Sequence, residues 1–195
     1  AFRGGSPPVN SGRTYTALQL GSLTYTISPP SFIQCNWTLN RKVVEYISNK
    51  LQPLAGKKIL DLYSGAGNFS LPFALDAEVT AVEGNPYAID DGMRNLELNG
   101  IKQCRFVRSS AESFQTTEHF DIVILDPPRP GLSRKVRDKV LAMMPERIVY
   151  LSCNPSTFAR DLQKLLPLYD IESINMIDFF PQTFHIETLA FLRLR

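Results

Sequence analysis

The sequence predicts an α/β fold with a doubly wound, mostly parallel sheet that ends in an antiparallel strand pair. From residue 58 onward, short apolar segments of strand length alternate with segments whose apolar residues recur at helical spacing. Several strand segments are apolar on both faces, which is typical of a sheet covered by helices on both sides. Residues 170–195 break the alternation, because two strand-like segments follow one another with no helical segment between them.

The part of the chain before this pattern is organised differently. Residues 1–13 are rich in Gly, Ser and Pro and are expected to be a linker or the cut edge of a longer chain. Residues 14–27 contain two short alternating runs around Gly21-Ser22, which predicts a hairpin. A helix is predicted over residues 39–51, and the proline and glycine that follow end it.

Strands and helices then take turns along the chain. Strands are predicted at 58–63, 78–82, 104–107, 120–125, 147–152, 169–179 and 188–195. Helices are predicted directly after the Gly-rich turn at 64–68 and at 86–98, 133–144 and 155–166. Asn85 is the expected N-cap of its helix, and Pro86 occupies the first helical position.

Composition limits the function classes. The chain has 195 residues, 44% of them apolar, and a net charge of +2, which neither indicates nor forbids a nucleic-acid partner. No apolar run approaches the roughly 18 residues that a membrane span needs, so no membrane association is expected. The cysteines, Cys35, Cys104 and Cys153, are odd in number and widely spaced. They fit neither a disulfide framework nor a zinc site, so no metal and a cytoplasmic location are expected.

Ligands of such sheets bind at the carboxyl ends of the strands. The first of these ends is followed by a loop in which Gly65 and Gly67 let backbone approach a ligand closely. Glu83 ends the second strand, where its carboxylate can accept hydrogen bonds from ribose hydroxyls. Ser70 replaces the third glycine of the dinucleotide fingerprint, which favours a nucleoside without a pyrophosphate. S-adenosylmethionine, which has no phosphate, suits this acidic pocket, and the carboxylate of Asp61 can lie near its sulfonium.

Simpler interpretations of these residues stay open. Two glycines spaced by one residue occur in any tight strand-to-helix turn. Asp61 can pin the loop by bonding backbone amides. Ala111 and Glu112 follow the third strand, and they either flank an adenine or start a helix with a carboxylate.

Two further loops at this edge carry reactive groups. Asp126-Pro-Pro-Arg-Pro-Gly131 follows the fourth strand, and its adjacent prolines make it rigid. Ser152-Cys-Asn-Pro155 follows the fifth strand and places Cys153 directly before a helix, whose N-terminus is expected to lower the thiol pKa. A buried structural cysteine is the alternative. A turn between the last two strands, Phe180 to Glu187, is expected to return to Cys153.

Five motifs, taken in order, resemble the RNA uracil-5-methyltransferase family, which makes 5-methyluridine in ribosomal and transfer RNA. They are Phe32-Ile-Gln34-Cys-Asn36, the Gly-rich loop, Asp126-Pro-Pro-Arg-Pro-Gly-Leu132, Ser152-Cys-Asn-Pro155 and His185-Ile-Glu187. The likeness runs from about residue 20 to the end. It implies a Rossmann-like class I methyltransferase fold with S-adenosyl-L-methionine as cofactor and RNA as partner.

The resemblance also implies roles for individual residues. Cys153 is the nucleophile that adds to carbon 6 of uracil, Glu187 is the base that removes the proton from carbon 5, and Asp126 holds the edge of the uracil. The implied substrate-binding residues are Phe32, Pro127, Arg129 and His185. The expected cofactor-binding residues are Gln34, Asp61, Tyr63, Gly65, Gly67, Asn68, Glu83, Asn85, Ala111 and Asp126. The target uridine must leave its stack to reach the thiolate.

Several residues also have structural interpretations. His185 can be a turn residue that orients Glu187, and Cys35 and Cys104 are expected to be packing residues. Arg129 can steady its loop or meet an RNA phosphate. For Arg129 and the basic residues after it a solvated helix face is the more ordinary interpretation. Those basic residues are Arg134, Lys135, Arg137 and Lys139.

We therefore divide the chain into three parts. These are 1–13, a linker or cut edge; 14–36, a hairpin remnant of a preceding domain with the Phe-x-Gln-x-Asn segment; and 37–195, the methyltransferase domain. Full-length members of the family carry an N-terminal RNA-binding β-barrel and an intervening domain, so we expect a fragment of a longer protein. We expect a monomer that acts on ribosomal rather than transfer RNA.

Four rival functions are weaker. An amino-group methyltransferase has an aromatic residue where Arg129 stands and needs no cysteine. An RNA cytosine-5-methyltransferase places a cysteine in the loop after the fourth strand, and this sequence has none there. A non-catalytic nucleoside- or RNA-binding fragment and a nicotinamide-dependent dehydrogenase are the remaining alternatives.

Overall fold

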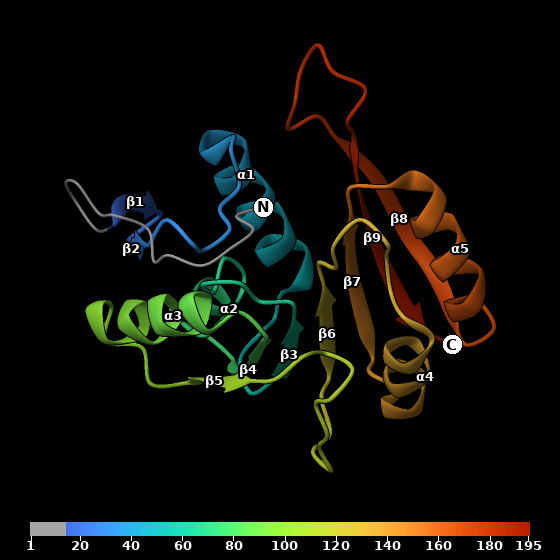
Figure 1. Cartoon of the computed structure of the whole chain (residues 1–195). Coiled ribbons are helices and arrows are strands. Elements are labelled where there is room, and N and C mark those ends of the chain that lie inside the picture. The colour runs from blue at the N-terminus through green and yellow to red at the C-terminus, as the bar shows by residue number, and fades with distance from the viewer. Residues whose placement is uncertain (1–14) are drawn as a thin grey trace, which may run out of the picture.

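A computed structural model describes residues 15–195, and a seven-stranded sheet of order β5-β4-β3-β6-β7-β9-β8 forms its centre (Figure 1). The strands are β3 (Lys58–Leu62), β4 (Glu78–Glu83), β5 (Cys104–Arg108), β6 (Ile122–Leu125), β7 (Arg147–Ser152), β8 (Tyr169–Ile177) and β9 (Glu187–Leu194). Strands β3 to β7 are parallel, and β9 is antiparallel to both of its neighbours. The predicted fold class is therefore confirmed. The division at 1–13 lies outside the described residues.

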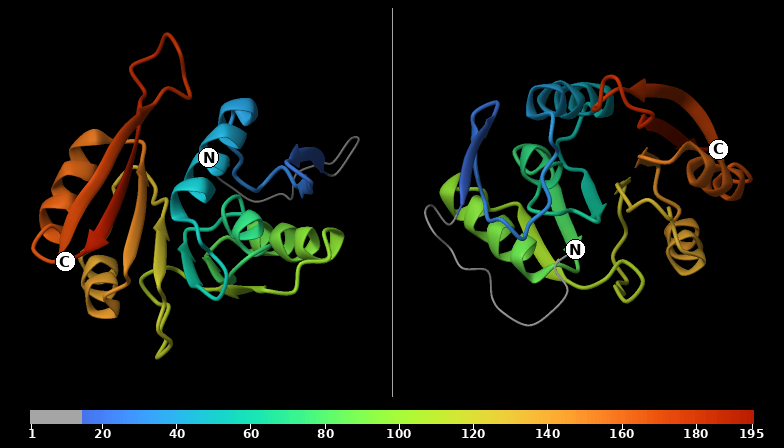
Figure 2. Two further views of the ribbon diagram at one scale, coloured as in Figure 1. Left: turned by 180° about the vertical axis from the view of Figure 1, so that it is seen from behind. Right: turned by 45° about the horizontal axis from the view of Figure 1, so that its top comes forward.

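Helices cover both faces of the sheet (Figure 2). They are α1 (Trp37–Leu51), α2 (Ser70–Phe73), α3 (Pro86–Leu98), α4 (Arg134–Met143) and α5 (Pro155–Leu165). The helix predicted after the Gly-rich turn is only the single turn α2, and Pro72 lies inside it. Asn85 caps α3 with Pro86 at its first turn, as predicted. Among the helices of residues 15–195, none is long and apolar enough to cross a membrane.

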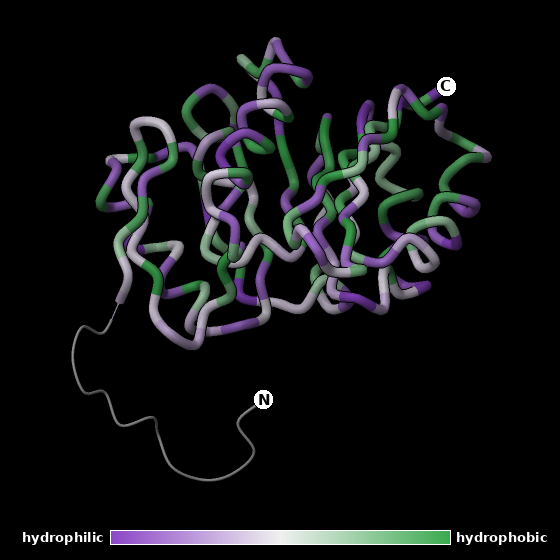
Figure 3. The backbone as a smooth tube through the Cα atoms, turned by 90° about the horizontal axis from the view of Figure 1, so that it is seen from above, coloured by the Kyte–Doolittle hydropathy of each residue, from purple (hydrophilic) through white to green (hydrophobic). Residues whose placement is uncertain are grey.

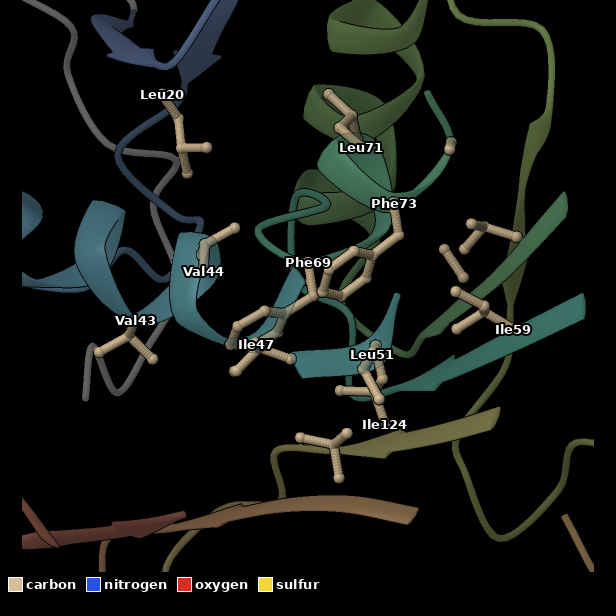
Figure 4. Packing of buried hydrophobic residues seen from close by; sticks show 14 of the residues in the cluster. Leu20, Val43, Val44, Ile47, Leu51, Ile59, Phe69, Leu71, Phe73 and Ile124 are labelled. Carbon is tan, nitrogen blue, oxygen red and sulfur yellow. The ribbon is translucent and has the colours of Figure 1, made fainter. Parts of the chain in front are cut away.

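Side-chain alternation along the strands builds two apolar clusters. On one face, strand residues such as Ile59 and Ile124 pack against Ile47 of α1 and Phe73 of α2 (Figure 4). On the other face, strand residues such as Leu60 pack beneath α4 and α5. Because successive side chains of a strand point to opposite faces, each buried strand contributes to both clusters. Figure 3 shows these hydrophobic segments alternating with hydrophilic ones along the chain.

The predicted hairpin consists of β1 (Thr16–Leu20) and β2 (Leu23–Ile27), which pair in antiparallel register around Gly21. The buried side chains of Leu23 and Tyr25 belong to the same apolar cluster as α1. The hairpin therefore shares a hydrophobic core with α1 and the central sheet.

A polar stripe on α3 covers the outer edge of the hairpin. Every second backbone N–H there donates to a side-chain oxygen of α3 at 2.8 Å. The pairs are Thr24 with Asn99, Thr26 with Asn95 and Ser28 with Asp91. Two residues of a strand span about 6.6 Å, and four residues of a helix span about 6.0 Å. The strand donors and the helix acceptors therefore recur at nearly the same spacing. The helix thus replaces a neighbouring strand.

Candidate active site

Three reactive side chains lie on one side of the sheet, at the edge where the parallel strands end. Residues of a strand that are two positions apart share a face. The pairs are Ile124 and Asp126, Leu151 and Cys153, and Leu189 and Glu187, and the first member of each lies in the cluster beneath α1. Alternation therefore directs the carboxylates and the thiol towards the side of the sheet that carries α1.

Cys153 and Glu187 are neighbours across β7 and β9. Ser152 pairs with Thr188 in the antiparallel register, and the Thr188 hydroxyl donates to the Ser152 carbonyl at 3.1 Å. One step further along each strand, Cys153 comes beside Glu187. The structure therefore brings together the two residues expected to act as nucleophile and base.

The expected effect of the helix N-terminus on Cys153 is wrong in its net direction. Burial raises the pKa of the thiol above its ordinary value, and the carboxylates of Glu187 and Asp126 raise it further. The charge of Arg129 opposes this rise without reversing it. Burial and two nearby carboxylates together disfavour the thiolate at this position.

The two carboxyl groups hold protons unusually tightly. Burial, followed by the charge of Asp126, raises the pKa of Glu187 to about 7. Burial raises the pKa of Asp126 to about 6. Glu187 is only 7% exposed, so water does little to stabilise its ionised form. Groups with such values can accept or release a proton near neutral pH.

A cavity opens beside Asp126, between the ends of β3 and β6. This is the topological switch point, where the strand order reverses between β3 and β6. Ligands of open α/β sheets bind at such points. Its lining comes from the Gly-rich loop, the hairpin, the segment before α1 and the loop after β6. Of the predicted site residues, it contains Phe32, Gln34, Tyr63, Gly65, Asn68 and Asp126.

One position of the Gly-rich loop, Gly67, has a backbone conformation and surroundings that suit only glycine. Gly67 has a φ of +92°, and a Cβ there would lie 2.1 Å from Cδ1 of Leu71. Gly65 also has a positive φ, +55°, but no atom lies within 4 Å of the place of its Cβ. Tyr63 takes a φ of +66° although it is not glycine. Such strained backbone concentrates where a loop must approach a ligand.

Asp61 lies beneath this loop rather than in the cavity. It is fully buried, and it accepts a hydrogen bond from the Ser70 hydroxyl at 2.5 Å. Burial raises its pKa to about 7. The geometry fits the interpretation of Asp61 as a residue that pins the loop, because both the hydroxyl and the backbone of Ser70 bond its carboxylate. A place near a sulfonium stays a prediction.

Glu83 clamps the Gly-rich loop to the start of α3. Its carboxylate accepts hydrogen bonds from the backbone N–H groups of Gly65 at 2.9 Å and Asn85 at 2.7 Å. Asn85 in turn accepts from the Tyr87 N–H and donates to the Pro30 carbonyl at 3.1 Å. This carboxylate fixes the relative positions of three segments at the carboxyl edge.

The loop after β5 departs from one expectation. Ala111 is buried and its backbone lies in a turn rather than at a helix start, so the helix-start interpretation of residues 111–112 is wrong. Lys139 of α4 donates to the backbone carbonyls of Ala111, Glu112 and Phe114. Lys139 therefore holds this loop, and its prediction as part of a solvated face is also wrong.

Sequence reasoning missed Asp161 on α5. This fully buried carboxylate accepts hydrogen bonds from the Leu132 N–H at 2.8 Å and the Tyr150 hydroxyl at 2.9 Å. It also pairs with Arg137 at 3.0 Å, so Arg137 is not part of a solvated face either. Asp161 anchors the end of the loop that carries Asp126. An aspartate within the apolar stripe of a predicted helix was the available signal.

Asn40 is a second residue that was missed. It is 1% exposed on α1, and its amide exchanges two hydrogen bonds with that of Asn68, at 2.7 and 3.1 Å. Asn40 therefore orients a residue of the cavity wall. Cys104 is buried, as predicted, but Cys35 is exposed and is not a packing residue.

Arg129 and His185 connect the two loops beside Cys153. The Nη2 atom of Arg129 lies 3.2 and 3.3 Å from the two ring nitrogens of His185. The Arg129 carbonyl accepts from the Thr157 hydroxyl at 3.2 Å, which ties the same loop to α5. Pro127 is buried in this loop. In residues 15–195, no three His, Cys, Asp or Glu side chains cluster as metal ligands.

This sheet, with a Gly-rich loop and a cavity at its switch point, has the fold of S-adenosylmethionine-dependent methyltransferases. Trm5b from Pyrococcus abyssi, at 14% identity and a TM-score of 0.73, shares the fold over 95% of this chain and 57% of its own. The tRNA (uracil-54, C5)-methyltransferase of Pyrococcus abyssi, solved with S-adenosyl-L-homocysteine, is more similar. It is 37% identical, with a TM-score of 0.84, over 93% of this chain and 45% of its own.

The family model for tRNA (uracil-5-)-methyltransferases matches residues 16–195, and the chain belongs to this family. The 23S rRNA (uracil(1939)-C(5))-methyltransferase RlmD of Vibrio campbellii is 40% identical over 179 residues, or 88% of the chain. An uncharacterised RNA methyltransferase of Thermosynechococcus vestitus is 36% identical over 97% of the chain. The chain spans 40% and 43%, respectively, of the lengths of these relatives.

Proposed function

We propose that this protein transfers a methyl group from S-adenosylmethionine to carbon 5 of a uridine in RNA. The observation that carries the proposal is that Cys153, directly after β7, lies beside Glu187, the first residue of the neighbouring strand β9. Asp126 acts on both groups electrostatically and also lines the adjoining cavity. A thiol, a base and an adjoining cavity at one edge are the parts that methylation of a pyrimidine carbon requires.

The residues of the cavity fit S-adenosylmethionine. The Ser64 hydroxyl lines the cavity and is buried without a hydrogen-bond partner in residues 15–195, so it is available to a polar ligand. The Gly65 backbone and the Asn68 amide lie on the same wall. When bound, the cofactor supplies an electrophilic methyl group on a cationic sulfur. Gln34, Tyr63 and Asp126, which also line the cavity, would hold it.

Cys153 makes carbon 5 of the uracil nucleophilic. The thiolate adds to carbon 6, forming an S–C6 bond, and the electron pair of the C5–C6 double bond becomes an enolate that includes carbon 5. Carbon 5 then takes the methyl group. The thiol gives its proton to solvent, and because Asp126 raises the thiol pKa, it does so more readily when Asp126 is protonated or hydrogen-bonded to the substrate.

Glu187 completes the reaction as a base. It removes the proton from carbon 5, the C5–C6 double bond forms again, and the S–C6 bond breaks to return the thiolate. A pKa of about 7 suits this task, because the group is then partly ionised at neutral pH and still a useful base.

We infer that the target is a uridine in a loop or a flipped position, because Cys153 is only reachable by an unstacked base. Ribosomal RNA is favoured over transfer RNA by the likeness to the Vibrio campbellii enzyme. The protein is proposed to work as a monomer in the cytoplasm, where its unpaired thiols stay reduced.

The test uses an RNA stem-loop that contains 5-fluorouridine at the target position, together with S-adenosylmethionine. Fluorine cannot leave as a proton does, so mass spectrometry should find the RNA covalently attached to Cys153. Cys153→Ala should abolish both the adduct and 5-methyluridine formation while keeping affinity for S-adenosylhomocysteine, and Cys35→Ala should change neither product. Methylation of carbon 5 by the Cys153→Ala variant would overturn the proposal.

A further inference from the structure

The loop between β8 and β9 stands above the site. It begins where Ile177 pairs with Glu187, so it projects directly from the carboxyl edge that holds the reactive groups (Figure 1). The loop is fixed by its own bonds, because the Phe180 carbonyl accepts from the Thr183 N–H at 3.1 Å and from its hydroxyl at 2.8 Å. The Thr183 hydroxyl also accepts from the His185 N–H at 3.2 Å.

Three rings form a series in this loop. Phe180 packs against the apolar cluster beneath α1 and serves as the anchor. His185 meets Phe180 edge-on at 5.9 Å between ring centroids and lies 4.2 Å from the ring of Phe184. Phe184, the outermost ring, is 90% exposed. Phe180 and His185 thus pack behind the ring of Phe184, and the outer face of that ring is exposed to solvent.

A cation lies beside this ring series. Arg129 approaches both nitrogens of His185, and its charge opposes the rise in the pKa of Cys153, so this cation lies within electrostatic reach of the thiol. Aromatic rings beside an arginine are the combination that binds unpaired nucleotides. The rings take the bases, and the guanidinium takes the phosphate.

We propose that Phe184 is a stacking platform for the nucleotide next to the target uridine. This inference rests on the proposed function and adds a contact that controls RNA binding. When the uridine turns out of its stack to reach Cys153, the adjacent base loses a neighbour. The outer face of Phe184 replaces that neighbour, with His185 supporting the ring from behind and the guanidinium of Arg129 placed for the phosphate.

The test measures binding of an RNA stem-loop that carries 2-aminopurine next to the target uridine. Stacking on Phe184 quenches the fluorescence of this base. Phe184→Leu keeps an apolar side chain but loses the flat ring, so the Kd for RNA should rise about tenfold and the quenching should be lost. Phe184→Trp should restore both. Tyr15→Ala, which removes another exposed aromatic ring on the hairpin side, should leave both unchanged.

Kinetics and cofactor binding distinguish this proposal from the proposed function. Phe184→Leu should raise the KM for RNA with little change in kcat, and affinity for S-adenosylhomocysteine should stay the same. Equal RNA affinity and equal quenching for the unaltered chain and Phe184→Leu would overturn the stacking role alone. If the unaltered chain forms no 5-methyluridine in any RNA tested, the proposed function fails, and the stacking role fails with it.

Discussion

Cys153 lies beside Glu187 because β7 and β9 run in opposite directions and Ser152 is in register with Thr188. Two reactive groups from distant parts of the chain thus meet where β9 begins and β7 has just ended, so the hydrogen-bonded sheet fixes their positions. Their mutual influence is unfavourable for the thiolate, since the carboxylate raises the thiol pKa. This relationship yields two predictions.

The first prediction concerns the reactivity of Cys153. Glu187→Gln removes a negative charge beside the thiol, so the thiol pKa should fall and more thiolate should be present at pH 8. The alkylation rate of Cys153 by iodoacetamide should rise roughly three- to tenfold, which corresponds to about 1 kcal/mol. Peptide mass spectrometry reads the rate, and the exposed Cys35 in the same sample is the control. An unchanged rate at Cys153 with Glu187→Gln would contradict the assigned neighbourhood.

The second prediction concerns stability and pH. The folded-state pKa of Glu187, about 7, lies above its ordinary value, so the folded chain binds this proton more tightly than the unfolded chain. The stabilisation that Glu187 gives by binding this proton is therefore fully present below about pH 4.5, and it is lost as the pH rises through 7. Glu187→Gln stays neutral at every pH. Above pH 8 its free energy of unfolding should therefore exceed that of the unaltered chain by up to roughly 3 kcal/mol.

Urea unfolding at pH 5 and pH 8 measures this difference. At pH 5 the two proteins should differ little, because the folded chain keeps the Glu187 carboxyl protonated there. A difference of the same size at both pH values would show that packing or hydrogen bonding, and not ionisation, distinguishes the variant.

The third prediction compares the two glycines of the loop after β3. Gly67→Ala places a Cβ 2.1 Å from Leu71, so it should displace the loop, lower stability by more than about 2 kcal/mol and abolish S-adenosylhomocysteine binding. Gly65→Ala meets no atom and should cost only about 1 kcal/mol for its positive φ. Calorimetry gives both stability and affinity. Equal effects of the two changes would argue against the described loop geometry.

The fourth prediction tests the buried anchor Asp161. Asp161→Ala leaves Arg137 and the Leu132 N–H without their partner, so the free energy of unfolding should fall by about 3–5 kcal/mol. The matched control is Asp170→Ala, which removes an exposed ion pair with Arg195 and should change stability by less than about 1 kcal/mol. Chemical unfolding measures both. The anchor role would be refuted by a loss below 1 kcal/mol for Asp161→Ala.

The sequence was sufficient to predict the layers and the edge that holds the site. Apolar runs of strand length and helical runs alternate clearly, so the sheet, its helices and the loops at its carboxyl edge follow from local pattern. The hairpin and the cap at Asn85 were predictable from turn and capping chemistry. The convergence of Cys153 and Glu187 on one edge followed from the expected turn of the last two strands.

Residues whose roles depend on distant partners could not be predicted in the same way. The raised pKa of Cys153 could not be predicted, because the helix N-terminus is a local feature, whereas burial and the carboxylates of Glu187 and Asp126 depend on other parts of the chain. Lys139 and Arg137 resemble a solvated helix face until carbonyls after β5 and the carboxylate on α5 are placed beside them. Cys35 is exposed because the segment before α1 presents other side chains to the cavity.

The series of side-chain contacts between β2 and α3 also limits how this region can change in length. A residue inserted within α3 between Asp91 and Asn99 would turn the following part of the helix by about 100° and carry Asn99 away from Thr24. An insertion within β2 would reverse which side chains face the core. Natural length variation in this region should therefore concentrate in the turn at Gly21 and in the loop after Asn99. The numbers of residues in β2 and in α3 should stay constant.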